Sequence, residues 1–261
     1  MNLAVGLLPH GPTAGNGAAL PGSAAPPVVL VTFGRECSGT TPAGETRREA
    51  LMRYYGERMT AEAWSEAPLS DTHGLPSWVF PPAEGFTATD IDHMPQLPAH
   101  TEVIDGSLAF VSLQASFHTL TLFLLERELR RFCPAHLRVR REMSVVLGLR
   151  QRPEPDLVVL HAEAVQGTDE TAYKASDVLL AVEVVSPDSE ERDRKRKPQL
   201  YAEAGIAHFW RIENQAGRPT VYVYELDPAT TTYALTGIYH DRLTLSVPFG
   251  IDIDLTEIDA L

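Results

Sequence analysis

One acidic residue stands inside an otherwise apolar stretch of the chain. The run Val178–Val185 reads Val-Leu-Leu-Ala-Val-Glu-Val-Val, with Glu183 as its single charged residue. Such a run is typical of a central strand that is covered on both faces. A carboxylate buried there is costly unless it is protonated, paired with a cation or bound to a metal. Glu183 therefore belongs either to a structural ion pair with a nearby Arg or Lys, or to a reactive site.

A second acid begins the preceding apolar stretch. Asp156 follows Pro155 and opens the predicted strand Asp156–His161. Consecutive strands are usually neighbours in space, so Asp156 and Glu183 can converge at one place on a sheet. Two converging carboxylates repel each other, and a hard divalent cation such as Mg²⁺ or Mn²⁺ relieves that repulsion. For Asp156 alone, turn formation beside a proline is the competing interpretation.

A helix is predicted directly after the strand of Glu183. Asp188 suits the N-cap position, and Glu191 three residues later suits its capping-box partner. The predicted helix runs to about Ala204, and Gly205 stands where a left-handed C-terminal residue is needed.

One face of this helix carries polar groups that could reach Glu183. Asp193, Lys197 and Tyr201 recur at intervals of four residues, so they lie close to one face. Lys197 could point back at the strand end and stabilise charge on a phosphate or orient an attacking water. The alternative is a solvated charged face, and we favour that interpretation for Arg192–Arg196.

The remaining pattern predicts a strand-rich domain of the α/β or α+β class with a mixed sheet. Ser116–Phe132 has the apolar spacing of an amphipathic helix. The predicted strands are Thr101–Asp105, Ser107–Leu113, Leu137–Leu147, Asp156–His161, Val178–Val185, Ile206–Ile212, Thr220–Leu226, Tyr233–Tyr239 and Leu243–Val247.

The N-terminal third differs in composition from the rest. Residues 1–34 contain no Asp, Glu, Lys or Arg and are rich in Gly and Pro, which disfavours regular elements. A short helix is compatible with residues 45–57, and residues 65–100 are again loop-like. We therefore predict a largely disordered or loop-like arm over residues 1–85 and one folded domain over residues 86–261.

Composition limits the classes of function. The chain has 261 residues, of which 44% are hydrophobic and 22% charged, enough for a sizeable core. The 22 Lys and Arg against 35 Asp and Glu give a net charge of −13. This argues against a broad basic surface that coats nucleic acid, but it allows a locally basic cleft. No run approaches the roughly 18 apolar residues of a membrane helix, so we expect no membrane association.

Targeting and redox signals are weak. The first cation is Arg35, and the apolar run Val28–Phe33 is too short for a signal-peptide core. Cys37 and Cys133 cannot build a disulfide framework or a zinc site by themselves. We expect a cytoplasmic protein. An internal start at Met59 would make the residues before it an extension of the native chain.

A series of motifs in the C-terminal half resembles the Uma family of restriction-endonuclease-like proteins. The matching segments are Pro155-Asp156, Val182–Pro187, Arg192-Asp193, Lys197, Tyr201–Ile206 and Phe209-Trp210, in that order. Upstream, Glu102–Leu108 is similar to the strand-turn-strand entry of that family, and Ser116–His118 to the start of its first core helix. The resemblance covers about residues 86–250.

The resemblance implies a PD-(D/E)XK nuclease core, with a mixed central sheet flanked by helices and a divalent metal held by acids. Asp156 and Glu183 would be the metal-binding acids, and Glu102 an additional acid near the metal. The usual lysine of the superfamily falls at Val185 here, so Lys197 would take its place. His118 would lie near the site or serve as an ordinary packing residue.

Three functions follow from these residues. The first is a Mg²⁺-dependent or Mn²⁺-dependent endonuclease that hydrolyses phosphodiester bonds of DNA, with Asp156, Glu183, Lys197 and Glu102 as its catalytic residues. The second is a binding or assembly module that keeps the nuclease scaffold with little catalysis, which the net charge and Val185 favour. The third is a nuclease whose target a partner supplies.

Two expectations concern binding surfaces. Arginines near the cleft would bind the substrate, namely Arg138, Arg140, Arg141, Arg192 and Arg194. A homodimer is predicted by analogy with nucleases that cut both strands, and by an apolar face that the alternation in Thr220–Leu226 could leave exposed.

Overall fold

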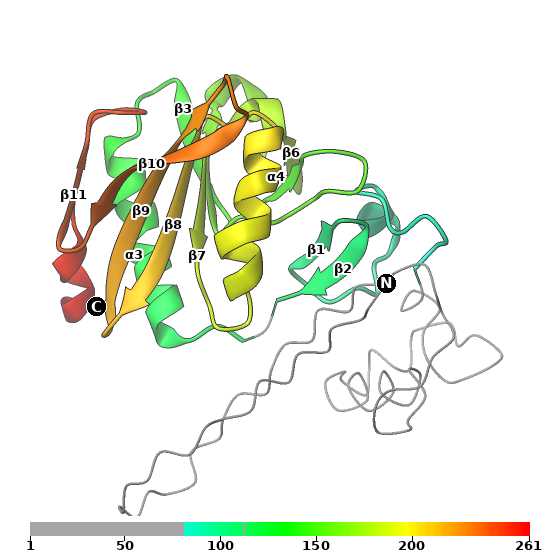
Figure 1. The fold of residues 1–261 in the computed structure, drawn as a ribbon, viewed down its shortest axis with the longest axis horizontal. Coiled ribbons are helices and arrows are strands. Elements are labelled where there is room, and N and C mark those ends of the chain that lie inside the picture. The colour runs from blue at the N-terminus through cyan, green and yellow to red at the C-terminus, as the bar shows by residue number, and fades with distance from the viewer. Residues whose placement is uncertain (1–80, 112) are drawn as a thin grey trace, which may run out of the picture.

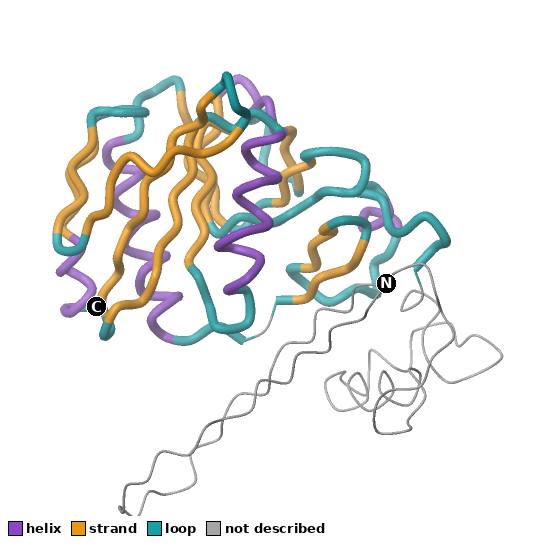
Figure 2. Tube along the Cα trace, viewed as in Figure 1, coloured by secondary structure: helices purple, strands orange, loops and turns teal. Residues whose placement is uncertain are grey.

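A six-stranded mixed sheet with helices on both faces forms the centre of the protein (Figures 1 and 2). The computed structural model describes residues 81–111 and 113–261. The helix α3 (Ser116–Phe132) covers one face of the sheet, and the shorter α4 (Lys197–Glu203) covers the other. The predicted α/β class is confirmed. The predicted arm, apart from residues 81–85, and the helix at 45–57 lie outside the described residues, so the domain boundary stays a prediction.

The central sheet has the strand order β10-β9-β8-β7-β5-β3. Its strands are β3 (Leu137–Arg141), β5 (Leu157–His161), β7 (Val178–Val184), β8 (His208–Gln215), β9 (Arg218–Asp227) and β10 (Thr232–Tyr239). Only β7 and β8 pair in parallel among these neighbours. A parallel pair needs a long crossover, and here the crossover contains α4.

Three two-stranded sheets surround the central one. They are β1 (Thr101–Ile104) with β2 (Ser107–Phe110), β4 (Ser144–Val146) with β6 (Ala172–Lys174), and β11 (Arg242–Leu245) with β12 (Ile251–Asp254). Short helical turns are η2 (Asp90–His93), η3 (Ala162–Ala164), η4 (Ala175–Asp177) and η6 (Leu255–Ala260). Within the described residues, no helix has the length and apolar character that crossing a membrane requires.

Alternation along the central strands sorts their side chains between two cores. In β5, Leu157 and Val159 pack in the cluster that contains the leucines of α3, whereas Val158 and Leu160 pack in the cluster that contains Tyr201 of α4. Successive side chains of a strand point to opposite faces. In β7 the same rule puts Ala181, and with it Glu183, on the face covered by α4.

The predicted single strand Leu137–Leu147 is wrong. The chain breaks at Glu142, whose φ of 52° lies in the left-handed region. The backbone N–H of Glu142 donates to the carbonyl oxygen of Asp156 at 3.0 Å, and β4 then leaves the central sheet to pair with β6. This break places Glu142 and Asp156 at the same end of neighbouring strands.

The helix after β7 begins later than predicted and is not regular. Asp188 lies in the preceding turn, and the helix starts at Glu190. Its next part, η5 (Arg192–Arg196), is a π-helix, closed by the Lys197 N–H that donates to the carbonyl oxygen of Arg192. Pro198 explains the wider turn, since proline has no N–H to donate and its ring crowds the preceding turn.

The C-terminal end of this helix agrees with the prediction. Gly205 has a φ of +80°, which a side chain would disfavour. The N–H of Ile206 donates to the carbonyl oxygen of Tyr201, and that of Gly205 donates to Ala202, both at 3.0 Å. This is the Schellman arrangement, and it turns the chain into β8.

The strand that suggested a dimer has its apolar face inside the protein. Val221 and Val223 of β9 are buried in the core cluster that α3 shares. These valines therefore leave no apolar surface exposed on Thr220–Leu226. The homodimer stays a prediction by analogy.

We expect truncation of the α3 face to cost far more stability than truncation of a surface leucine. Leu125 is fully buried, so Leu125→Ala should lower the free energy of unfolding by about 2–5 kcal/mol through lost burial and a cavity. Leu113 is fully exposed, and Leu113→Ala should change it by less than about 0.5 kcal/mol. Urea unfolding followed by circular dichroism measures both, and equal losses would contradict the described core.

Candidate active site

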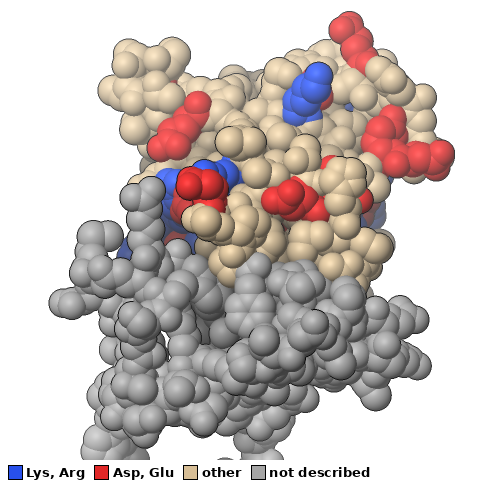
Figure 3. Space-filling view, turned by 90° about the vertical axis from the view of Figure 1, so that its right-hand side faces the viewer, with Lys and Arg blue, Asp and Glu red and all other residues tan. Residues whose placement is uncertain are grey.

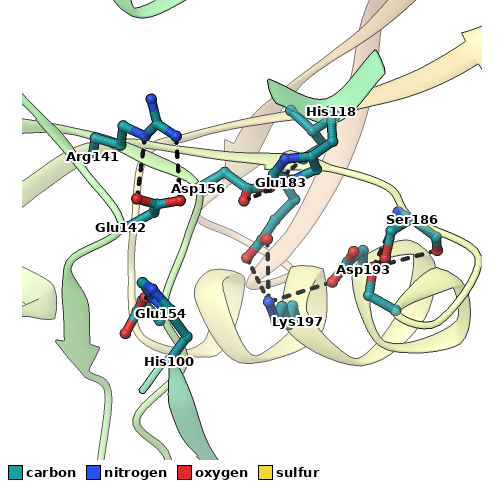
Figure 4. A network of polar contacts seen from close by, with 12 residues as sticks. His100, His118, Arg141, Glu142, Glu154, Asp156, Glu183, Ser186, Asp193 and Lys197 are labelled. Carbon is teal, nitrogen blue, oxygen red and sulfur yellow. Dashed lines mark hydrogen bonds and ion pairs between the residues drawn. The ribbon is translucent and has the colours of Figure 1, made fainter. Parts of the chain in front are cut away.

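Asp156 and Glu183 meet at one end of two neighbouring strands. β5 and β7 pair antiparallel, with Leu157 opposite Val182, so the next residues outward are Asp156 and Glu183. The backbone N–H of Val184 donates to Asp156 Oδ2 at 2.6 Å, which fixes the aspartate against β7. Figure 4 shows the two acidic side chains side by side. The structure thus brings together the two acids that the sequence singled out.

Glu183 is held by two side chains of the helix that follows it. Lys197 Nζ lies 3.1 Å from each of the two carboxylate oxygens of Glu183. The hydroxyl of Tyr201 donates to Glu183 Oε1 at 2.5 Å. Lys197 therefore points back at the strand. Its contact with Glu183 is also the ion pair that the sequence offered as the structural alternative for this glutamate.

Two further carboxylates surround the ammonium group of Lys197. Its Nζ lies 2.8 Å from Glu102 Oε1 and 3.3 Å from Asp193 Oδ1. All four side chains are at most 5% exposed. Asp193 is also the residue at i−4 from Lys197, so the local helix geometry brings these two together.

The expectation of a solvated face over Arg192–Arg196 is wrong for its first two residues. Arg192 and Asp193 are buried, whereas Arg194 and Lys195 are exposed and pair with acids of their own surroundings. The π-helical turn carries Asp193 inward on the same side as Lys197. The polar face of this segment is therefore part of the site.

Glu102 reaches the site from the β1–β2 hairpin, outside the central sheet. Its Oε1 accepts from the backbone N–H of Glu154 at 2.8 Å as well as contacting Lys197. Its Oε2 is buried and has no hydrogen-bond partner within residues 81–111 and 113–261. A bidentate pair between Arg196 and Asp105 holds the turn of the hairpin against the same helix.

His118 lies in the first turn of α3 and contacts the other side of Asp156. Its Nε2 is 3.0 Å from Asp156 Oδ1, and the side chain is buried. Together with the N–H of Val184, this contact fixes both oxygens of Asp156. His118 is thus a neighbour of the acids rather than a packing residue remote from them.

The site holds more negative than positive formal charge. Burial raises the pKa of Glu183 well above its usual value, and Asp193, Asp156 and Glu102 raise it further, while Lys197 opposes the shift. Burial likewise raises the pKa of Asp193. Burial lowers the pKa of Lys197, but its three acidic neighbours outweigh that effect and raise it well above the usual value. One lysine therefore does not compensate all the acids around it.

The donor set suits a hard divalent cation at Asp156 and Glu183. Among the residues that the structure describes, no three or more His, Cys, Asp or Glu side chains are arranged to hold a metal. Mg²⁺, however, commonly takes only one or two protein carboxylates and keeps waters. An ionised carboxylate has about four acceptor positions, so both acids retain capacity. The Asp156 side chain is 17% exposed and accessible from solvent. Glu102, predicted as a further ligand, contacts Lys197 through Oε1, and its role as a ligand stays a prediction.

Four of the five predicted substrate arginines make polar contacts with the chain itself. Arg138 and Arg140 donate to backbone carbonyl oxygens. Arg141 pairs with Glu142, and Arg194 with Glu190 and Glu213. Arg192 is buried with an Nε that lacks a hydrogen-bond partner in the described chain. In the face shown in Figure 3, the visible described side chains form separate acidic and basic groups instead of one basic band.

Sequence reasoning gave no role to Asp193 and Tyr201, although both were on the predicted helix face. The signal that could have found them was the interval of four residues to Lys197. Glu154 was missed altogether. It lies beside the site, where His100 Nδ1 contacts its carboxylate at 2.5 Å and its backbone N–H holds Glu102 (Figure 4).

Comparison with known families decides the relationship of the chain. Residues 89–256 match the family model of Uma2, described as "Putative restriction endonuclease". The chain belongs to the Uma2 family. The matched region contains Glu102, Asp156, Glu183 and Lys197, and its start agrees with the resemblance noted in the sequence.

A crystal structure of a "putative nuclease belonging to DUF820" from Anabaena variabilis ATCC 29413 aligns with 16% identity and a TM-score of 0.49. The alignment covers 65% of this Uma2 chain and 97% of that chain. No curated protein matches the chain significantly.

The raised pKa of Glu183 predicts that the protein becomes less stable as pH rises above the pKa of an unfolded glutamate. This applies to the protein without divalent cations, which a chelator removes. Unfolded Glu loses its proton near pH 4.3, whereas folded Glu183 keeps its proton to higher pH, so the native state binds more protons in between. The free energy of unfolding should then decrease through this window, by at most about 1.4 kcal/mol per pH unit for one proton.

Glu183→Gln should flatten that decrease, because the amide does not titrate. The matched control is Glu163→Gln at an exposed glutamate, which should leave the profile unchanged. Chemical unfolding at a series of pH values measures the profile. A Glu183→Gln profile that is as steep as that of the original chain would show that Glu183 is not the group responsible.

Proposed function

We propose that this Uma2 chain is a divalent-metal-dependent endonuclease that hydrolyses phosphodiester bonds of DNA, with Asp156 and Glu183 as metal ligands. The observation that carries the proposal is the meeting of these acids at one end of β5 and β7, with Lys197 Nζ 3.1 Å from Glu183. Family membership supports nuclease chemistry in general. Metal dependence and DNA as the substrate belong to the proposal.

The residues of the chain have distinct tasks in this proposal. A bound Mg²⁺ or Mn²⁺ would supply Lewis-acid chemistry, polarising the scissile phosphate and lowering the pKa of a water. Asp156 and Glu183 would hold the cation. His118 and the Val184 N–H keep Asp156 in place, and Tyr201 keeps Glu183 in place.

Lys197 supplies a positive charge close to the two acids. In hydrolysis, the oxygen of water forms a bond to phosphorus while the bond from phosphorus to the leaving oxygen breaks, and the proton that the water loses is balanced by the proton that the leaving oxygen gains. The ammonium of Lys197 would stabilise the negative charge that accumulates on the phosphate oxygens. This places on α4 the task that a lysine at position 185 would otherwise have, since Val185 has no charge.

The alternative is a binding or assembly module on the same scaffold. The net charge of −13 and the complete pairing of Lys197 with acids favour it. In such a protein the buried cluster would serve stability alone. A homodimer, a cytoplasmic location and a partner that supplies the target remain predictions.

Removal of a metal ligand should abolish cleavage without abolishing the fold. We expect plasmid and oligonucleotide DNA to be cut with Mg²⁺ or Mn²⁺ and to stay intact with a chelator. Asp156→Asn and Glu183→Gln should each slow cleavage by about 10³-fold or more, equivalent to about 4 kcal/mol in activation free energy. Circular dichroism should show that the variants are folded.

Glu163→Gln is the matched control and should cut at the original rate, because Glu163 is an exposed acid outside the site. Cleavage that persists in Glu183→Gln at the original rate would remove the proposed mechanism. A chain that neither cuts nucleic acid nor binds Mn²⁺ in isothermal titration, and whose Glu183→Gln variant is stable, would instead support the binding module. RNA oligonucleotides in the same assay distinguish the substrate class.

A further inference from the structure

The ammonium group of Lys197 joins acids from three separate segments. Its Nζ contacts Glu102 on the β1–β2 hairpin, Glu183 on β7 and Asp193 in the π-helical turn. The distances are 2.8 Å, 3.1 Å and 3.3 Å in that order. Figure 4 shows Lys197 beneath the Glu183 carboxylate with Asp193 beside it. The lysine therefore already supplies a counter-charge to Glu183.

Glu102 and Asp193 are fixed independently of Glu183. The N–H of Glu154 holds Glu102, and the backbone N–H of Asp193 donates to the carbonyl oxygen of Ser189 at 2.8 Å. Glu102 also has a buried oxygen, Oε2, without a hydrogen-bond partner in the described residues. Two negative charges would thus still hold the ammonium group if Glu183 no longer did.

A divalent cation at Glu183 would compete with this ammonium group. Lys197 Nζ contacts both oxygens of Glu183, and a metal ion would need at least one of them at about 2.0–2.1 Å. Like charges at such short range repel strongly in a site from which water is largely excluded. Glu183 is therefore shared between two cations that cannot both keep their best contact.

We propose that Lys197 is a resident counter-cation that competes with the divalent cation for Glu183, while Glu102 and Asp193 are positioning residues that keep its ammonium beside the site. This inference rests on the proposed function, because it requires a cation at Asp156 and Glu183. It reassigns Glu102 from metal ligand to holder of Lys197. It also explains why the third and fourth acids lie on the lysine side of Glu183.

The inference predicts that removal of the lysine charge strengthens metal binding. Lys197→Met keeps most of the side-chain length and removes the charge, so the Kd for Mn²⁺ in isothermal titration should fall by about tenfold or more. Cleavage should be lost in the same variant. The matched control is Lys195→Met two residues away, where the lysine is exposed, and both quantities should stay unchanged.

The original ammonium group can be observed directly, since the chain has only three lysines, Lys174, Lys195 and Lys197. In a Lys174→Arg/Lys195→Arg chain with isotope-labelled lysine, the one remaining NMR signal of a lysine ammonium group comes from Lys197. Mg²⁺ should shift this signal as the ammonium leaves Glu183. This measurement also decides the matter if Lys197→Met does not fold, because an unmoved signal at saturating Mg²⁺ would overturn the inference.

The positioning role has its own measurement. Asp193→Asn and Glu102→Gln should lower kcat but weaken Mn²⁺ binding much less than Asp156→Asn, which removes a ligand. Loss of affinity in Asp193→Asn or Glu102→Gln, as large as in Asp156→Asn, would make these acids ligands and overturn their assignment.

The outcomes separate the two proposals. If the original chain binds Mn²⁺ and cuts DNA but Lys197→Met binds Mn²⁺ no more tightly, the proposed function stands and the inference fails. If neither chain binds Mn²⁺, both fail.

Discussion

The contact between the ammonium group of Lys197 and three buried carboxylates is the interaction on which the site depends. Buried charges are tolerated only when they are paired, and these acids come from a hairpin, a central strand and a helix. The acids of the hairpin and of the central strand would be uncompensated without the lysine of the helix. Electrostatics therefore fixes how the hairpin and the helix dock against the sheet, in addition to the apolar packing of Tyr201 and Leu200.

Much of this arrangement could be predicted from local patterns. The helix Ser116–Phe132 has the predicted bounds because its apolar spacing is regular and its core face is continuous. The apolar run around Glu183 identified the central strand, and the pairing of β5 with β7 followed from the tendency of consecutive strands to be neighbours. The four-residue interval from Asp193 to Lys197 indicated a shared face.

What could not be predicted depends on contacts between distant residues. The break at Glu142 satisfies a hydrogen bond to Asp156, which lies fourteen positions later, so periodicity over Leu137–Leu147 contains no sign of it. The π-helical turn arises from Pro198 acting on the residues before it, and a search for caps and periodicity alone overlooks this effect. The excess of acids around one lysine emerges only when hairpin, sheet and helix are assembled.

The hairpin that carries Glu102 is not part of the central sheet. Val103 bridges to Arg152 through paired backbone hydrogen bonds, and this bridge and the contacts with Lys197 and Arg196 attach the hairpin to the body of the protein. The residues that form the central sheet and its covering helices are therefore not all the residues that form the site. A fragment starting at α3 would retain all six central strands and both sheet-covering helices. Its Lys197, however, would lack the carboxylate of Glu102.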